Sequence, residues 1–167
     1  MPEIVFDCCV ISNFALAEAL GVLENLYKDE AFITDFAAAE VLRGIQAGHS
    51  RLGAIPEAVR SGWLRETGLR PGDEKRLFES LSRSLGLGEA SSIAAAKRRG
   101  FVLASDDRVA RAEAARLGIP LTGTVGILVR AVREGVCNPG KADEHLARMV
   151  EAGFFSPVRS IRELTRR

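Results

Sequence analysis

The chain has 167 residues and a net charge of +1, with 47% apolar and 27% charged residues. This length suits one domain spanning residues 1–167, and the composition is that of an ordinary globular protein. A charge so close to zero excludes binding of nucleic acid through an overall field, and a single Trp and a single Tyr make no base-stacking platform evident.

The cysteines and the N-terminus indicate the compartment. Cys8, Cys9 and Cys137 are odd in number and lack the Cys-x-x-Cys spacing of a zinc site. Cys8 and Cys9 follow an apolar run, where reduced cysteines are expected to be buried. No signal peptide is evident, and no apolar run approaches the ~20 residues that span a bilayer. We therefore expect a cytoplasmic protein without a membrane contact.

Short apolar runs alternate with amphipathic segments along the first part of the chain, as expected for strands and helices. In chain order the expected elements are a strand at 3–6, a helix at 12–26 with a break at Gly21, a strand at 31–33, a helix from 34 or 35 to about 48, a helix near 52–60 and an edge strand at 63–67.

The second part of the chain continues the alternation and predicts an α/β sandwich with a mainly parallel sheet. The expected elements are a turn at 71–73 opening a helix to about 85, a helix at 89–99 closed by Gly100, a strand at 101–104, a helix at 108–117, a strand at 119–121, a turn and helix at 122–133, a helix at 141–152 and a helix beginning at Ser156-Pro157.

Acidic residues follow two of the apolar strands. Asp7 ends the first, and Asp106-Asp107 end the strand at 101–104. Ligands of open parallel sheets bind at the carboxyl ends of the strands, so these carboxylates converge if the two strands are neighbours. Clustered carboxylates repel one another unless they are protonated or bound to a cation. Their oxygen atoms suit Mg²⁺ or Mn²⁺, which can activate a water for attack on a phosphoryl group.

Each acid also has a purely structural interpretation. Asp106 or Asp107 could cap the helix that begins at Arg108, although two adjacent acids exceed what one cap requires. Asp7 could equally begin a turn. For these residues the site and the structural role both stay open.

Two further acids lie on helices. Glu89 is in the first turn of its helix, where the helix dipole favours a carboxylate, and its face is expected to point toward the sheet edge. Glu40 lies far round its helix from the apolar arc of Val41, Leu42 and Ile45. The pattern alone therefore predicts a solvent-exposed Glu40.

Five segments of the chain occur in the order of one known family. They are residues 4–13 (IVFDCCVISN), 39–42 (AEVL), 87–94 (LGEASSIA), 103–111 (LASDDRVAR) and 118–128 (GIPLTGTVGIL). Each is weak by itself, but together they cover most of the chain. The sequence resembles a PIN domain, and in particular a prokaryotic branch whose members often have no assigned role.

The resemblance implies a three-layer α/β/α sandwich that binds Mg²⁺ or Mn²⁺ in an acidic pocket and hydrolyses RNA. Many relatives are toxins of toxin–antitoxin pairs and form homodimers, so RNA, a small antitoxin protein and a second copy are the expected partners. By position, Asp7, Glu40, Glu89 and Asp107 would be the catalytic acids. The metal ligands would be Asp7, Glu89, Asp106 and Asp107.

Residues beside the final acids receive supporting roles from the same resemblance. Ser105 would be the small hydroxyl residue that orients a ligand or a water. Arg108 could contact RNA phosphates or neutralise the acidic pair, and Arg111 is expected to neutralise it. The chain departs from the family at Cys8 and Cys9, where Thr or Ser is usual, so a supporting hydroxyl is missing unless Ser12 or Asn13 replaces it.

Two other function classes fit the sequence less well. Phosphoryl transfer through an aspartyl-phosphate would use Asp7, but one such family requires a second acid two residues later, where this chain has Cys9. A catalytically silent PIN-like module that binds RNA or a partner is the main alternative, although all four acidic positions are filled. Phe154 and Phe155 are the apolar residues that hint at a dimer surface.

Overall fold

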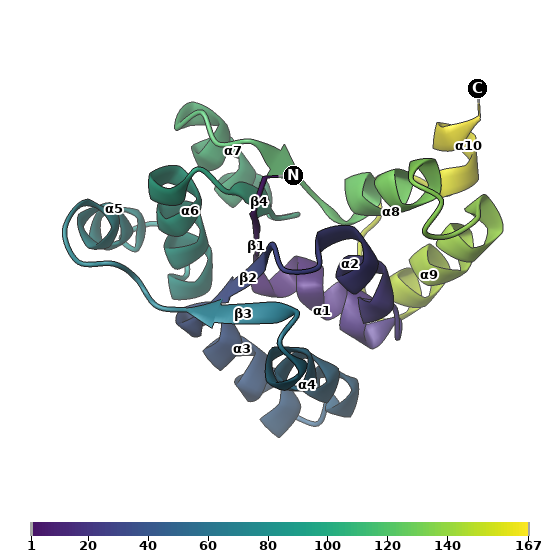
Figure 1. The fold of residues 1–167 in the computed structure, drawn as a ribbon, viewed down its shortest axis with the longest axis horizontal. Coiled ribbons are helices and arrows are strands. Elements are labelled where there is room, and N and C mark those ends of the chain that lie inside the picture. Colours follow the sequence, from purple (N-terminus) through teal and green to yellow (C-terminus); the bar gives the residue numbers. More distant parts are fainter. Residues whose placement is uncertain (1, 167) are drawn as a thin grey trace.

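A parallel sheet between two layers of helices forms the centre of the molecule (Figure 1). The computed structural model describes residues 2–166, so Met1 and Arg167, the ends of the expected domain, lie outside the described residues. Within that range the sheet has five strands in the order β3-β2-β1-β4-β5, all parallel. The strands are β1 (Ile4–Phe6), β2 (Ala31–Thr34), β3 (Leu64–Thr67), β4 (Val102–Ala104) and β5 (Leu121–Thr122). The predicted α/β/α sandwich with a parallel sheet is confirmed.

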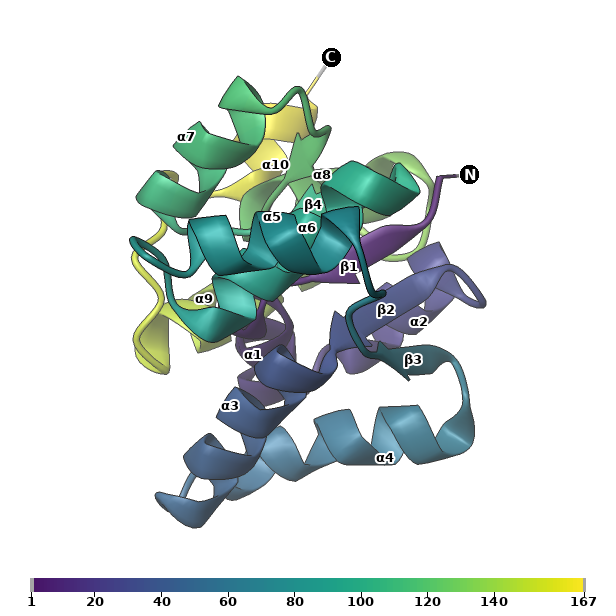
Figure 2. The same cartoon turned by 90° about the vertical axis from the view of Figure 1, so that its left-hand side faces the viewer.

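The helices divide between the two faces of the sheet. One face carries α1 (Cys8–Leu16), α2 (Leu20–Tyr27), α3 (Asp35–Gln46), the 3-10 helix η1 (Ser50–Gly53), α4 (Ala54–Ser61), α8 (Thr124–Arg133), α9 (Pro139–Glu151) and α10 (Ile161–Thr165). The other carries α5 (Asp73–Leu81), α6 (Leu87–Arg99) and α7 (Arg108–Arg116), and Figure 2 looks onto the side of α5 and α6. In residues 2–166, no helix has the length and apolar character needed to cross a membrane.

The central strand β1 is buried on both sides, which explains its continuous apolar sequence. Ile4 and Phe6 pack into the larger apolar cluster, and Val5 between them packs into the smaller cluster under α5, α6 and α7. This alternation is the ordinary two-residue period of a strand. Because β1 pairs with β4, and Phe6 lies opposite Ala104, the residues that follow these two strands meet at one edge of the sheet.

Helix α6, which carries Glu89, is anchored at its C-terminal end by a buried ion pair. The Arg99 guanidinium donates to Glu74 on α5 (Nη2 to Oε1, 2.5 Å) and to the main-chain oxygen of Gly68 (2.7 Å). Burial raises the pKa of the Glu74 carboxyl, but the hydrogen bonds and charge of Arg99 outweigh it and the net pKa is lowered. The pair thus ties α6 to α5 and to the end of β3.

The break expected at Gly21 is misplaced. The segment expected as a helix at 12–26 consists of two helices, α1, which begins at Cys8, and α2, which begins at Leu20. The break between them lies at 17–19, where Glu18 has a φ of 57°, and Gly21 lies inside α2. The Ala19 amide bonds to the Phe14 oxygen (2.8 Å), which closes α1 before Gly21 is reached. A single glycine costs a helix only ~1 kcal/mol, so it does not have to end one.

The last helix does not begin at Ser156-Pro157. The Ser156 hydroxyl instead closes a tight turn by accepting from the Val158 amide (3.2 Å). Helix α10 begins at Ile161, whose amide donates to the Asp143 carboxylate (2.6 Å). The Ser160 hydroxyl caps the same helix start by accepting from the Glu163 amide (3.4 Å), which is a local signal, whereas the Asp143 carboxylate comes from α9 and is not visible in the local sequence.

Candidate active site

Four carboxylates from four helices face the carboxyl edge of the sheet. Asp7 and Asp107 are the N-cap residues of α1 and α7, directly after β1 and β4. Glu89 is in the first turn of α6, and Glu40 is in the middle of α3. The carboxylates after β1 and β4 were expected to converge if these two strands are neighbours, and the two strands are neighbours in the sheet.

Asp7 is the buried member of this acid cluster, defined as Asp7, Glu40, Glu89 and Asp107, and it is only 1% exposed. Its Oδ1 accepts from the Cys8 amide (2.7 Å), and its Oδ2 accepts from the Ser105 hydroxyl (3.1 Å). Burial raises the pKa of Asp7 to about 7, and the negative charges of Glu89 and Glu40 act in the same direction against the two hydrogen bonds. Asp7 therefore lies within electrostatic reach of acids on two other helices.

Ser105 links the ends of the two central strands. Its buried hydroxyl donates to Asp7 and accepts from the Asp107 amide (3.2 Å). The hydroxyl expected to orient a ligand or a water thus orients two acids of the cluster. Asp107 itself accepts from the Ala110 amide through Oδ2 (2.8 Å), which is the capping bond that the structural interpretation predicted.

Glu89 is half-buried at the start of α6. Its Oε2 accepts from the Gly86 amide at 3.3 Å, a long bond that satisfies the main-chain donor of the residue before the helix. Burial raises the pKa of Glu89, and the negative charges of Asp107 and Glu40 raise it further. Glu89 is therefore the acid that connects the α3 side of the cluster to the α7 side.

Glu40 is not solvent-exposed, and the expectation from the helix pattern is wrong. Helix α3 packs against α6, and Glu40 Oε1 accepts from the Gly88 amide (3.1 Å). A Cβ atom on Gly88 would come within 2.4 Å of that oxygen, so glycine permits this close approach. Leu42, assigned to the apolar arc, is instead 51% exposed. Only the neighbouring helix shows which way α3 faces.

Asp106 occupies a different environment from its neighbour Asp107. Its Oδ1 accepts from the Thr124 amide (2.9 Å), and its Oδ2 accepts from the Thr124 hydroxyl (2.5 Å) and the Asn13 side-chain amide (3.3 Å). These bonds connect the end of β4 to the start of α8 and to α1. Asn13, considered as a replacement for the missing hydroxyl, is thus engaged with Asp106.

The residues flanking the acid cluster also differ from expectation. Arg111 donates from Nη1 to the main-chain oxygens of Ser105 (2.6 Å) and Thr122 (3.0 Å), so it binds the backbone where an ion pair with the acids was expected. Cys8 is half-buried and Cys9 is exposed, so the expectation that both are buried is wrong for Cys9. Helix α1 begins at Cys8 and turns the next side chain outward.

The donor chemistry of the acid cluster fits a hard divalent cation. In residues 2–166, no three His, Cys, Asp or Glu side chains are arranged so that they could hold a metal ion. Glu40 and Glu89 instead each accept a main-chain N–H bond, at 3.1 and 3.3 Å. The pKa values of Asp7 and Glu89 are nevertheless raised, first by burial and then by repulsion between the carboxylates, and a bound cation would offset that repulsion.

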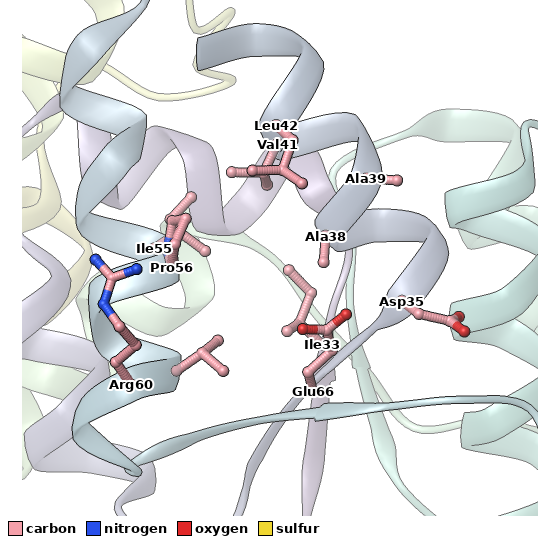
Figure 3. Close-up of a pocket in the computed structure, with 11 residues that line it drawn as sticks. Ile33, Asp35, Ala38, Ala39, Val41, Leu42, Ile55, Pro56, Arg60 and Glu66 are labelled. Atoms are coloured by element: carbon pink, nitrogen blue, oxygen red, sulfur yellow. The ribbon is translucent and has the colours of Figure 1, made fainter. Parts of the chain in front are cut away.

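A separate cavity of about 440 Å³ lies between α3 and α4 (Figure 3). Its walls are mainly apolar, including Ile33, Val41 and Ile55, and Arg60 and Glu66 also line it. None of the four clustered acids lines this cavity. The cavity is therefore distinct from the candidate active site.

Comparison with known proteins identifies the family of the chain. A protein-family model described as a PIN domain matches residues 3–167. A search of the curated proteins gave no match. The matched residues include all four acids of the cluster and both strands that carry its first and last members.

Proposed function

Because the chain belongs to the PIN-domain family, whose members are generally nucleases, we propose that it is a metal-dependent endoribonuclease. The observation that carries the proposal is the position of Asp7. This buried carboxylate ends β1, and the charges of Glu89 and Glu40 help to raise its pKa to about 7. Such perturbed acids, gathered at a strand edge, are typical of a functional site.

The role of the chain's own carboxylates would be to bind the metal ion and hold it in place. Bound Mg²⁺ or Mn²⁺ supplies the means to activate a water and to offset charge on the phosphoryl group. Asp7, fixed in one orientation by Ser105 and by the Cys8 amide, would provide the rigid ligand. Glu40 and Glu89 would complete the acidic pocket through the carboxylate oxygens that do not accept their main-chain bonds.

Asp106 and Asp107 would have different roles. Asp107 would serve as a ligand through the oxygen that does not cap α7. Asp106 would hold the start of α8 in place, since both of its oxygens accept bonds from Thr124. This division modifies the expected metal set, in which both adjacent acids were ligands.

The proposal extends to the biological setting on the strength of the family resemblance. RNA is the proposed substrate, and the cytoplasm is the proposed location. A small antitoxin protein and a second copy of the chain are the proposed partners, which would make the protein the toxin of a toxin–antitoxin pair. A small reading frame directly upstream of its gene would support this setting.

The test is cleavage of labelled mixed RNA by the purified protein with Mn²⁺, with Mg²⁺ and with EDTA. We expect Asp7→Asn and Asp107→Asn to reduce the rate roughly 100-fold or more, since a bound metal contributes several kcal/mol to transition-state stabilisation. Asp73→Asn, the same charge change at an exposed position on α5, should cleave like the wild type.

Other outcomes would favour the other function classes. Cleavage that persists in EDTA and in both variants would contradict the metal mechanism. RNA binding without cleavage would favour a silent binding module. Phosphorylation of Asp7 by a small phosphodonor would favour an aspartyl-phosphate enzyme.

A further inference from the structure

Phe155 is an aromatic side chain held in solvent. It lies in the connection between α9 and α10 and is 96% exposed, whereas its neighbour Phe154 packs against the larger apolar cluster. A Phe side chain left in water forgoes the favourable free energy of burying its ring. The low aromatic content of the sequence suggests no stacking platform, yet the fold presents one complete ring.

The connection that carries Phe155 has a defined shape. The Phe154 amide bonds to the Met149 oxygen (2.9 Å), which closes the end of α9. On the other side, the Ser156 hydroxyl donates to the Val158 oxygen (2.6 Å) and accepts from the Val158 amide (3.2 Å). Hydrogen bonds on both sides of Phe155 therefore specify that Phe154 points inward and Phe155 outward.

The exposed ring borders a hollow that reaches the acidic end of β4. This hollow has a volume of about 530 Å³, and its lining includes Phe155, Arg108, Arg111, Asp106 and Gly126. In Figure 2 the yellow connection between α9 and α10 runs along the side of the molecule where α7 lies. None of the four clustered acids lines this hollow, and its link to them is Asp106, which directly precedes Asp107 in the chain.

The charges in the hollow suit a phosphodiester. Arg108, the first residue of α7, is exposed and shares the hollow with the Phe155 ring. Its helical neighbour Arg111 is half-buried and bound to main-chain oxygens. An aromatic face for a base and a cation for a phosphate are the two elements by which proteins bind single strands.

We propose that Phe155 and Arg108 form a subsite for one nucleotide of single-stranded RNA beside the acid cluster. The base stacks on the Phe155 ring, and Arg108 binds the adjoining phosphate. The strand is single because bases in a duplex are stacked on one another and cannot cover the ring. This inference rests on the proposed nuclease function and names the form of its substrate.

A second copy of the chain is the competing occupant, and the surroundings favour RNA over it. The centre of a homodimer interface is largely apolar and depleted in charged residues. Here the hollow that the ring borders is lined by two arginines and an aspartate as well as by the apolar residues Leu121, Val125 and Pro157. Exposed Val150 on α9 lines a neighbouring hollow together with Phe155, whereas the remaining large exposed apolar side chains lie on separate helices: Leu42 on α3, Leu87 on α6, Val109 on α7 and Leu164 on α10.

The test measures binding without cleavage. Fluorescence anisotropy in EDTA at low salt would compare a labelled oligoadenylate with an abasic strand of the same length. Phe155→Ala should raise the Kd for oligoadenylate about 5- to 100-fold and leave the Kd for the abasic strand unchanged. Phe155→Trp keeps an aromatic face and should bind oligoadenylate like the wild type.

Arg108 has its own readout. Arg108→Ala should weaken both strands alike and lower the salt slope of binding by about 0.7, the value for one phosphate contact on a single strand. Arg116→Ala is the matched control, because Arg116 has the same charge at the opposite, exposed end of α7. It should leave both the Kd and the slope unchanged.

Two results would overturn the subsite. One is a Phe155→Ala variant that binds oligoadenylate as tightly as the wild type. The other is a Phe155→Ala variant whose oligomeric state, measured by light scattering, changes while its Kd for oligoadenylate does not. That result would place the ring in an interface between copies of the chain. Wild-type binding that depends on Phe155 but is never followed by cleavage with Mn²⁺ would sink the proposed function and leave the subsite standing.

Discussion

At the scale of single residues, Asp7 is the group whose charge the fold tolerates least. Its ordinary pKa of 3.8 rises to about 7, chiefly through burial and then through Glu89 and Glu40. The folded protein therefore retains a proton between these values that the unfolded chain has lost. The stability associated with Asp7 is fully present below about pH 4 and is lost as the pH rises through about 7.

Asp7→Asn removes this charge without changing the shape of the side chain. In EDTA, we expect the variant to be more stable than the wild type at about pH 8, with an advantage that shrinks by on the order of 2–3 kcal/mol at about pH 5. Urea unfolding at both pH values measures the difference. Adding Mn²⁺ should stabilise the wild type more than the variant. An advantage that is equal at both pH values would contradict the raised pKa.

At the scale of elements, the contact between α3 and α6 determines the position of Glu40. The Gly88 amide donates to Glu40 Oε1, and the absence of a Cβ atom on Gly88 lets the two helices approach. Gly86 directly precedes α6 and has more space for a side chain. A Cβ atom there would lie 3.6 Å from Glu89 Oε2, which is an ordinary van der Waals contact. The two glycines therefore form a matched pair of positions.

Gly88→Ala should displace the Glu40 carboxylate and lower kcat/KM for RNA roughly 100-fold, since a shift of about 1 Å in a catalytic group has an effect of this size. Gly86→Ala should stay within about 2-fold of the wild type, because its methyl group makes only an ordinary contact. Urea unfolding would verify that both variants fold. Equal activity of the two variants would show that Glu40 does not need its present position.

At the scale of the whole molecule, two apolar clusters share one sheet. Trp63, the single Trp of the chain, is buried in the larger cluster, and Leu103 is buried in the smaller one on the opposite face. The three residues of β1 contribute to both clusters. A strand that serves two cores is expected to couple them into one unfolding unit, which is the behaviour that the single-domain prediction implies.

Leu103→Ala should therefore lower the midpoint of the Trp63 fluorescence transition although Leu103 lies across the sheet. The expected loss is about 2–5 kcal/mol in the free energy of unfolding, the usual cost of truncating a buried Leu. Far-UV circular dichroism should report the same transition in urea. A fluorescence transition left unchanged by the substitution would mean that the two faces unfold independently.

Much of the fold could be predicted from the sequence because its signals are local. Buried parallel strands are continuously apolar, and the capping roles of Thr34 and Asp107 follow from their positions before helices. The boundary at Glu18 could not be predicted, and at α10 only the Ser160 cap is local. A main-chain bond to Phe14 ends α1, and a carboxylate on another helix, Asp143, fixes the start of α10.

The sequence by itself determined which acids follow β1 and β4, because a strand that ends in a carboxylate is visible in the order of residues. Only the tertiary structure decided that Glu40 faces Gly88, that Asp106 bonds to Thr124 and that Phe155 points into solvent. The physical reason is the same in each case. A side chain's direction depends on the element packed against it, and that element is distant in the chain.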